Sequence, residues 1–182
     1  MRIAFTSTSS QGKTTLVKEM IKWDIFKDYT TFSSVQRVLT DCISDFSTSE
    51  LTTDFTQTCI LSVMAYNMHQ YPNQISDRSL ICNFAYSKVS DNVLNHKFLE
   101  EKFEKIIEMY DLIFYIPYEI EVQNDNFRST DGSFHKKIDD AIQEYIEKYK
   151  HKIKIITISG SIEDRLEKIY KVIKEINDTY KR

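Results

Sequence analysis

The residues best suited to chemistry form one short segment, 7–15, which reads Ser-Thr-Ser-Ser-Gln-Gly-Lys-Thr-Thr and directly follows the apolar run 2–6. A Gly-Lys-Thr sequence between a strand and a helix is typical of a phosphate-binding loop. In such a loop, backbone N–H groups surround nucleotide phosphates, a lysine reaches their β and γ oxygens, and a threonine hydroxyl contacts Mg²⁺. We therefore expect Lys13 to be catalytic and Thr14 to be a metal ligand. The residues expected to contact the nucleotide here are Ser7, Ser9, Ser10, Gln11, Gly12, Lys13, Thr14 and Thr15.

This loop departs from the usual spacing at Ser7, which stands five positions before Gly12, where a first glycine is expected. A serine there must either avoid positive φ or accept strain. The alternative interpretation of residues 7–15 is a turn, rich in serine and threonine, that only caps a helix. The position of the segment, between a predicted buried strand and an amphipathic stretch, favours phosphate binding.

A second polar segment, 75–81, ends a predicted strand and opens a predicted helix. Ligands of parallel sheets bind at the carboxyl ends of the strands, so Asp77 and Arg78 are expected on the same side of the sheet as the phosphate loop. Asp77 could hold the water shell of Mg²⁺ or accept a proton, and Arg78 could bind a phosphate or hydroxyl group of an acceptor. The alternative is an aspartate N-cap beside a surface arginine, and the local sequence favours neither.

Two further polar segments could complete such a site. Residues 124–132 are rich in turn-forming residues and precede a strong helical pattern, which suits a lid over about 119–134. In that lid Arg128 would neutralise charge on a transferring phosphoryl group, the alternative being an ordinary loop with a solvated arginine. Gly160 and Ser161 follow the last predicted strand, where a glycine either lets the backbone approach a nucleobase or only begins a helix.

Hydrophobic periodicity predicts the elements that must position these segments. Five short apolar runs are interpreted as buried strands, at 3–6, 29–33, 74–76, 112–116 and 153–158. Helical patterns lie between and after them, at 13–22, 35–46, 51–70, 79–88, 96–109, 134–149 and 162–178. Strands alternating with helices form crossover units, so we predict an α/β fold: a five-stranded, mostly parallel sheet with helices on both faces. With 182 residues and no linker or repeat, the chain is predicted to form a single domain, 1–182.

Composition limits the partners of this chain. Its net charge of −3 disfavours a nucleic-acid partner or a membrane surface. The three cysteines are widely spaced and lack a CxxC pair, which indicates reduced thiols rather than a disulfide framework or a zinc site. No apolar run is long enough to span a membrane. We therefore expect a cytoplasmic protein that acts on a small molecule.

Together, the phosphate loop and the three later segments resemble the P-loop nucleoside and nucleotide kinases, most nearly the compact group that contains the nicotinamide riboside kinase domain, with thymidylate kinases as wider relatives. The resemblance covers residues 2 to about 175 and rests on four motifs that follow one another in the order expected of these kinases. They are the loop, an Asp-Arg-Ser segment at 77–79, an Asp-Gly-x-Arg lid element at 125–128 with Asn126 in place of glycine, and a Gly-Ser-x-Glu-x-Arg turn at 160–165. The resemblance implies a three-layer P-loop kinase fold with a short lid, and ATP and Mg²⁺ as cofactors. It also implies that Asp77, Arg78 and Arg128 are catalytic together with Lys13. Asp77 would be a metal ligand together with Thr14.

One motif of these kinases is incomplete here. Members often carry an acid at the end of the second strand, followed three residues later by arginine; Arg37 matches, but Ser34 stands at the position of the acid. If that acid is the general base in relatives, this chain must use Asp77 as the base or rely on substrate positioning alone. A missing base need not abolish activity, because phosphoryl transfer depends chiefly on positioning and electrostatics. Dimers are common among such kinases, so a homodimer is the alternative to a monomer. By the same resemblance, the residues expected to contact the acceptor are Arg37, Phe55, Tyr66 and Arg78, with core packing as the alternative for the two aromatic rings.

Three functions fit these observations. The first is an ATP-dependent phosphotransferase that moves the γ-phosphoryl group of ATP to a nucleoside or nucleoside monophosphate, nicotinamide riboside included. The second is a kinase that acts on a modified base or an end of a polynucleotide, which the net negative charge disfavours. The third is a regulatory or ATPase-type nucleotide-binding module, which the missing acid keeps open.

Overall fold

The computed structural model describes residues 1–33, 35–47, 49–119 and 132–180. Within these residues, the centre of the protein is a sheet of five strands: β1 (Arg2–Thr6), β2 (Thr30–Phe32), β3 (Gln74–Ser76), β4 (Leu112–Tyr115) and β5 (Lys154–Thr157). Their order across the sheet is β2-β3-β1-β4-β5, and each neighbouring pair is parallel. The predicted five-stranded parallel sheet is therefore confirmed.

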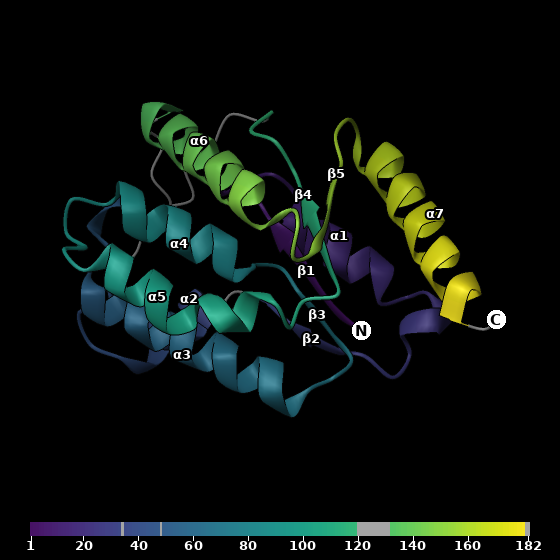
Figure 1. Ribbon diagram of the computed structural model, residues 1–182, viewed down its shortest axis with the longest axis horizontal. Coiled ribbons are helices and arrows are strands. Elements are labelled where there is room, and N and C mark those ends of the chain that lie inside the picture. The colour runs from purple at the N-terminus through teal and green to yellow at the C-terminus, as the bar shows by residue number, and fades with distance from the viewer. Residues whose placement is uncertain (34, 48, 120–131, 181–182) are drawn as a thin grey trace.

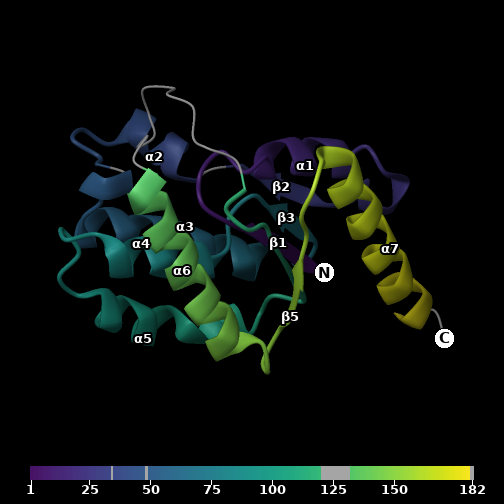
Figure 2. The ribbon, with the colours of Figure 1, turned by 90° about the horizontal axis from the view of Figure 1, so that it is seen from above.

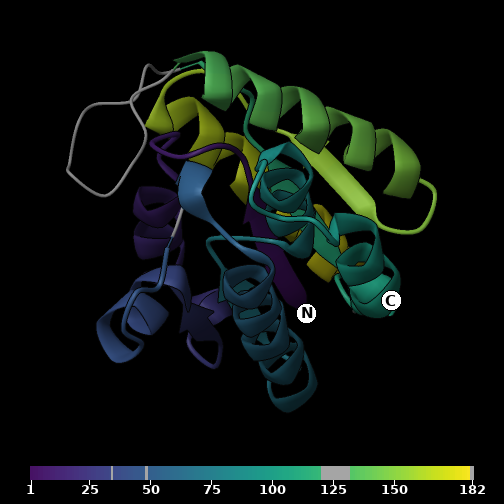
Figure 3. The same cartoon turned by 90° about the vertical axis from the view of Figure 1, so that its left-hand side faces the viewer.

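Helices cover both faces of this sheet (Figure 1). One face carries α1 (Lys13–Met20) and α7 (Ile162–Tyr180), and the other carries α3 (Asp54–Gln70), α4 (Leu80–Val89), α5 (His96–Ile107) and α6 (Gly132–Tyr149). The helix α2 (Val35–Cys42) packs beside α3, and two 3₁₀ turns lie at Asp24–Phe26 and Ser49–Leu51. The view from above separates the two helical layers (Figure 2), and in the side view α3 to α6 lie in front of α7 (Figure 3).

Alternating side chains of the central strands explain the two layers. In β1, Ile3 and Phe5 belong to the core that packs against α1 and α7, whereas Ala4 between them belongs to the core on the side of α3 to α6. Strand β4 alternates between the same two cores. A parallel strand covered on both faces is expected to be apolar at each position, as β1 and β4 largely are.

Two helix boundaries differ from the predicted ones by three residues or more, and the others by two at most. The helix predicted over 51–70 begins at Asp54, because the Thr53 side-chain oxygen accepts a hydrogen bond from the Thr56 N–H at 3.3 Å and caps it. The helix predicted over 35–46 ends at Cys42, and Asp45 has a φ of 56°, which a right-handed helix does not allow.

The parallel arrangement places the candidate segments at one edge of the sheet. Strands β1 and β3 are neighbours, so their carboxyl ends bring the phosphate loop and Asp77 together. Strands β4 and β5 end on the other side of β1, where Glu119 and Gly160 follow them. In the part of the chain described here, no helix is both long enough and apolar enough to cross a membrane.

Candidate nucleotide and acceptor site

The loop between β1 and α1 adopts a shape that needs only one glycine. Its two positive φ angles are at Ser10 (63°) and Gly12 (84°), so Ser7, at the position of the missing glycine, has an ordinary backbone conformation without that strain. At Gly12, a Cβ atom would lie 3.0 Å from Ile162 Cδ1 and 3.6 Å from Arg165 Nη1, in a φ region that side chains rarely adopt. Gly12 is therefore required by both its conformation and its neighbours.

The ammonium group of Lys13 is held inside the loop. Its Nζ atom lies 2.7 Å from Ser7 Oγ, it also donates to the backbone carbonyl of Thr8, and the residue is 7% exposed. Ser7 thus offers the lysine a hydroxyl partner that the expected glycine could not offer.

A direct hydrogen bond joins the phosphate loop to the segment after β3. Thr14 Oγ1 donates to Asp77 Oδ2 at 3.0 Å, and the backbone N–H of Asp77 donates to the carbonyl of Phe32 at 3.1 Å. Asp77 is buried, whereas Thr14 is exposed. Hydroxyl and carboxylate oxygens are suitable Mg²⁺ ligands, usually together with substrate phosphates and waters. The Thr14 hydroxyl and the Asp77 carboxylate therefore fit a magnesium ion bound together with a nucleotide. Among the described residues, no group of three or more His, Cys, Asp or Glu side chains could hold a metal ion by itself.

Three residues spaced four apart form a stripe on and before α4 that faces the loop: Arg78, Cys82 and Tyr86. Cys82 Sγ donates to the carbonyl of Ser7 at 3.3 Å, and the Tyr86 hydroxyl lies 3.1 Å from Ser9 Oγ. Arg78 Nη1 donates to Cys82 Sγ at 3.4 Å, and its guanidinium carbon lies 5.4 Å from the centre of the Tyr86 ring. Burial lowers the pKa of Arg78, but Cys82, Tyr86 and Asp77 outweigh it and raise the pKa above its usual value, so Arg78 stays charged.

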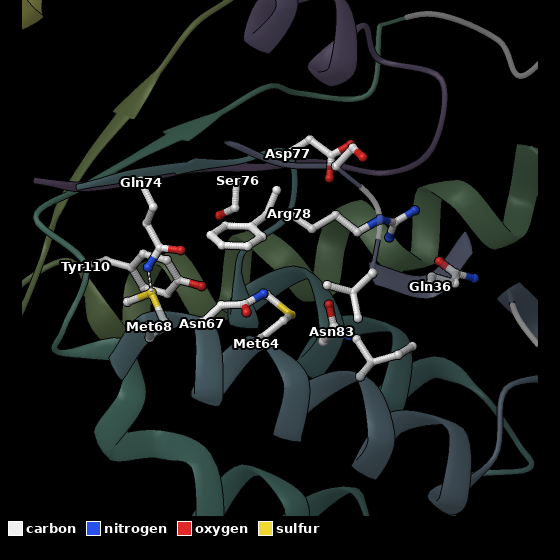
Figure 4. A pocket seen from close by; sticks show the side chains of 14 residues that line it. Gln36, Met64, Asn67, Met68, Gln74, Ser76, Asp77, Arg78, Asn83 and Tyr110 are labelled. Atoms are coloured by element: carbon white, nitrogen blue, oxygen red, sulfur yellow. Dashed lines mark hydrogen bonds between the residues drawn. The ribbon is translucent and has the colours of Figure 1, made fainter. Parts of the chain in front are cut away.

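A pocket of about 430 Å³, which includes its open mouth, lies beside Asp77 and Arg78 (Figure 4). Asp77 and Arg78 lie towards one end of it, whereas Gln74, Met68 and Tyr110 lie at the other. The pocket is lined by apolar residues and by amide side chains, namely Gln36, Asn67, Gln74 and Asn83. Among the described residues that line it, Arg78 is the one cation.

One amide oxygen in this pocket has no partner within the described chain. Gln57 Nε2 donates to Thr52 Oγ1 at 2.7 Å, which turns Gln57 Oε1 towards Asn83 Nδ2 at 3.4 Å. This relay leaves Asn83 Oδ1 buried and without a hydrogen bond in the described structure. An unsatisfied buried acceptor costs about 1–3 kcal/mol, so a ligand N–H or O–H group would suit it.

The end of the phosphate loop is held by Arg165 of α7, which is 1% exposed. Arg165 Nη1 donates to the carbonyl of Gln11 at 2.7 Å, and Nη2 pairs with Glu119 Oε2 at 2.8 Å. The same carboxylate oxygen accepts from the N–H of Gly160 at 3.3 Å, and the N–H of Glu119 donates to Gln11 Oε1 at 3.0 Å. The loop, the segment after β4 and the turn before α7 therefore form one network.

The structure brings the phosphate loop, Asp77 and Arg78 together, and it links the turn at Gly160 and Ser161 to the loop through Glu119. Ser161 stands directly before α7 and caps its first turn: its Oγ accepts from the Asp164 N–H at 3.1 Å and donates to Asp164 Oδ2 at 2.8 Å. Hydrogen bonds from the side chain and backbone of Ser161 lower the pKa of Asp164.

Three residues predicted to contact the acceptor do not line the pocket: Arg37, Phe55 and Tyr66. Phe55 and Tyr66 are 61% and 62% exposed, and Arg37 is exposed as well. Two parts of the prediction lie outside the described residues: Ser34, and residues 120–131 of the predicted lid, which include Arg128. The roles of these residues stay predictions.

Four residues of the site had no role in the sequence prediction: Cys82, Asn83, Tyr86 and Glu119. The spacing of four from Arg78 is a signal that could have found Cys82 and Tyr86. Asn83 and Glu119 have no such local signal, because their importance depends on which distant elements pack against them.

The strand order, the phosphate loop after β1 and the Asp77 that faces it define the fold of the P-loop kinases. A family model described as "AAA domain" matches residues 2–165, and the chain belongs to this family. Among curated protein sequences, none matches the chain significantly.

Solved structures with the same fold include nucleoside and nucleotide kinases. Deoxyadenosine kinase from M. mycoides, solved with dCMP and dCDP, has 17% identity and a TM-score of 0.72, with 97% of this chain and 100% of that chain covered. Thymidylate kinase from Ehrlichia chaffeensis has 14% identity and a TM-score of 0.62, with 96% and 98% covered. The NadR protein in complex with NR has 19% identity and a TM-score of 0.64, with 85% of this chain but 45% of NadR covered. These likenesses confirm the predicted P-loop kinase fold.

Proposed function

We propose that residues 1–182 act as one kinase domain that transfers the γ-phosphoryl group of ATP to a hydroxyl group of a nucleoside. The observation that carries this proposal is the 3.0 Å hydrogen bond between Thr14 and Asp77, because it joins a phosphate-binding loop to the rim of a pocket of about 430 Å³. Pockets with mostly apolar walls and a few polar groups are typical of small-molecule sites. The shared fold with nucleoside and nucleotide kinases supports the proposal.

Each part of the site has a role in this proposal. The backbone N–H groups of the loop and Lys13 would bind the phosphates of ATP, and Thr14 and Asp77 would hold Mg²⁺, which neutralises phosphate charge when bound. Gly160 and Ser161, on the far side of the loop, would lie near the base of ATP. Arg78 would stabilise charge on the phosphoryl group during transfer, and Arg128 stays a candidate for the same task. Because the transition state is loose, positioning and charge stabilisation supply most of the catalysis.

The charges of the pocket favour a nucleoside over a nucleoside monophosphate as the acceptor. A monophosphate brings negative charge that is usually bound by several arginine or lysine side chains. Among the described lining residues, Arg78 is the single cation, and it already lies next to Asp77. A neutral nucleoside places no such demand on the pocket.

The amide groups favour a base that carries an amino or carboxamide group. Asn83 Oδ1 can accept one hydrogen bond from such a group, and it has no partner among the described residues. A keto oxygen at that place would face the lone pairs of Asn83 instead of a donor. We therefore expect adenosine to be preferred to inosine, and cytidine to uridine.

A phosphoryl-transfer screen tests this proposal. The purified chain is incubated with ATP and Mg²⁺ and with nucleosides, nucleoside monophosphates, nicotinamide riboside or oligonucleotides with 5′-hydroxyl ends, and the products are separated. We expect a phosphorylated nucleoside, with an amino-bearing base preferred.

The other outcomes separate the alternatives. A product from monophosphates alone would contradict the choice of acceptor, and a phosphorylated oligonucleotide would support a polynucleotide kinase. ATP binding without acceptor-dependent turnover would support a regulatory or ATPase-type module.

A further inference from the structure

One contact of the stripe Arg78–Cys82–Tyr86 reaches both halves of the site. The Tyr86 hydroxyl lies 3.1 Å from Ser9 Oγ in the middle of the phosphate loop. The guanidinium carbon of Arg78, at the rim of the pocket, lies 5.4 Å from the centre of the same tyrosine ring. Tyr86 therefore touches one residue from the nucleotide side and one from the acceptor side.

Packing holds Tyr86 in one orientation. The residue is 5% exposed, and the ring of Phe134 from α6 lies edge-on against it, with 6.0 Å between the ring centres. Burial raises the pKa of Tyr86 above its usual value, although the charge of Arg78 opposes this. The hydroxyl is therefore protonated at neutral pH and can donate its hydrogen to Ser9.

The loop depends on such contacts more than a glycine-rich loop does. Ser9 precedes Ser10, a non-glycine residue with a φ of 63°, which few residues adopt without support. Four side chains from outside the loop are hydrogen-bonded to it in the described structure: Cys82 at Ser7, Tyr86 at Ser9, Arg165 at Gln11 and Asp77 at Thr14. Of these contacts, the one made by Tyr86 can be removed by deleting a single oxygen atom.

We propose that Tyr86 is a positioning residue that couples the two halves of the site, because it holds Ser9 of the phosphate loop in a fixed relation to Arg78. A ligand that orders Ser9 would then also order Arg78, so binding of nucleotide and of acceptor would strengthen each other. The acceptor half of this inference rests on the proposed function, whereas the nucleotide half does not.

The test compares Tyr86→Phe with Tyr145→Phe. Tyr145 is a matched control, because it is also buried and its hydroxyl donates to Glu100 Oε2 at 2.9 Å, on α5. Calorimetry measures the Kd of a non-hydrolysable ATP analogue with Mg²⁺, and the Kd of adenosine with and without that analogue. Thermal unfolding of each variant checks that its fold is retained.

We expect Tyr86→Phe to weaken binding of the analogue by about three- to tenfold, the usual effect of one hydrogen bond. In the unaltered chain the analogue should tighten adenosine binding by about fivefold or more, and in Tyr86→Phe by less than about twofold. Tyr145→Phe should change neither value. Ser9→Ala removes the same hydrogen bond from the loop and should match Tyr86→Phe, with no further loss in the double variant.

Equal binding of the analogue by the unaltered chain and by Tyr86→Phe would overturn the inference, as would full coupling in Tyr86→Phe. If the unaltered chain binds no adenosine and phosphorylates no nucleoside, the proposed function fails instead. In that case the analogue measurement still decides whether Tyr86 holds the loop.

Discussion

The phosphate loop and the acceptor pocket lie side by side but are built in opposite ways. The loop's polar groups find partners inside the chain: Lys13 contacts Ser7, and Gln11 contacts Arg165 and Glu119. The pocket has open space and, within the described residues, an amide oxygen of Asn83 without a partner. Polar groups of the loop are thus paired inside the chain, whereas the pocket leaves a hydrogen bond for the ligand to make.

The largest effect is expected at the centre of the loop. Lys13→Ala removes the charge that would stabilise the transferring phosphoryl group, so kcat/KM should fall by about 10²- to 10³-fold. A coupled ATP assay measures the loss, and thermal unfolding checks the fold. Lys22→Ala is the control, because Lys22 is exposed and pairs with Glu19. Normal turnover by Lys13→Ala would remove the phosphate loop from the mechanism.

Asp77→Asn tests the junction between the two regions. The amide keeps the shape of the side chain but removes its charge, so we expect about 10²-fold lower kcat and a higher Mg²⁺ concentration for half-maximal activity. Titration of activity with Mg²⁺ measures this requirement. Asp140→Asn, at an exposed position on α6, should leave both values unchanged. An unchanged Mg²⁺ requirement in Asp77→Asn would show that the carboxylate does not serve the metal.

Arg165→Met tests whether the loop depends on its outer network. The change leaves the Gln11 carbonyl and Glu119 without their buried partner, so the KM for ATP should rise by about tenfold. The free energy of unfolding should fall by about 2 kcal/mol, less than for a fully buried pair, because the Glu119 side chain is 35% exposed. Denaturant unfolding measures the stability. Adding Glu119→Gln to Arg165→Met should restore part of the lost stability, because it removes the unpaired charge. A double variant less stable than Arg165→Met would argue against a stabilising Arg165–Glu119 ion pair.

A smaller effect is expected in the pocket. Asn83→Ala removes the oxygen proposed to accept a hydrogen bond from the base, so the preference for adenosine over inosine should fall by about three- to tenfold. The ratio of the two kcat/KM values measures it. Asn67→Ala, which changes another amide of the same pocket, serves as the comparison. Equal loss of activity with both nucleosides would show that Asn83 supports the pocket without selecting the base.

The smallest effects are expected outside the pocket. Phe55 and Tyr66 are both more than half exposed and do not line it, so Phe55→Ala and Tyr66→Ala should change the acceptor KM by less than about twofold. Steady-state kinetics with the best nucleoside measures this. A large increase in KM would place these rings at the acceptor after all.

Much of the fold could be predicted, because the signals for it are local. Apolar runs of four and five residues predicted β1 and β4, and the spacing of four and three in Leu99, Phe103 and Ile106 predicted α5. The first boundary of α3 was less predictable, because the hydrogen bond from the Thr56 N–H to Thr53 decides it. The strand order was not local information, since it depends on which crossovers pack together.

The sequence by itself determined the phosphate loop, because a Gly-Lys-Thr segment between a strand and a helix carries its chemistry in adjacent residues. Only the tertiary structure decided what surrounds that loop. Tyr86 contacts Ser9 across 77 residues of sequence and Arg165 contacts Gln11 across 154. Their partners are set by how α4 and α7 pack against the sheet. The direction of the Gln57 amide leaves Asn83 Oδ1 without a partner among the described residues. Such contacts depend on the meeting of distant elements, which adjacent residues do not encode.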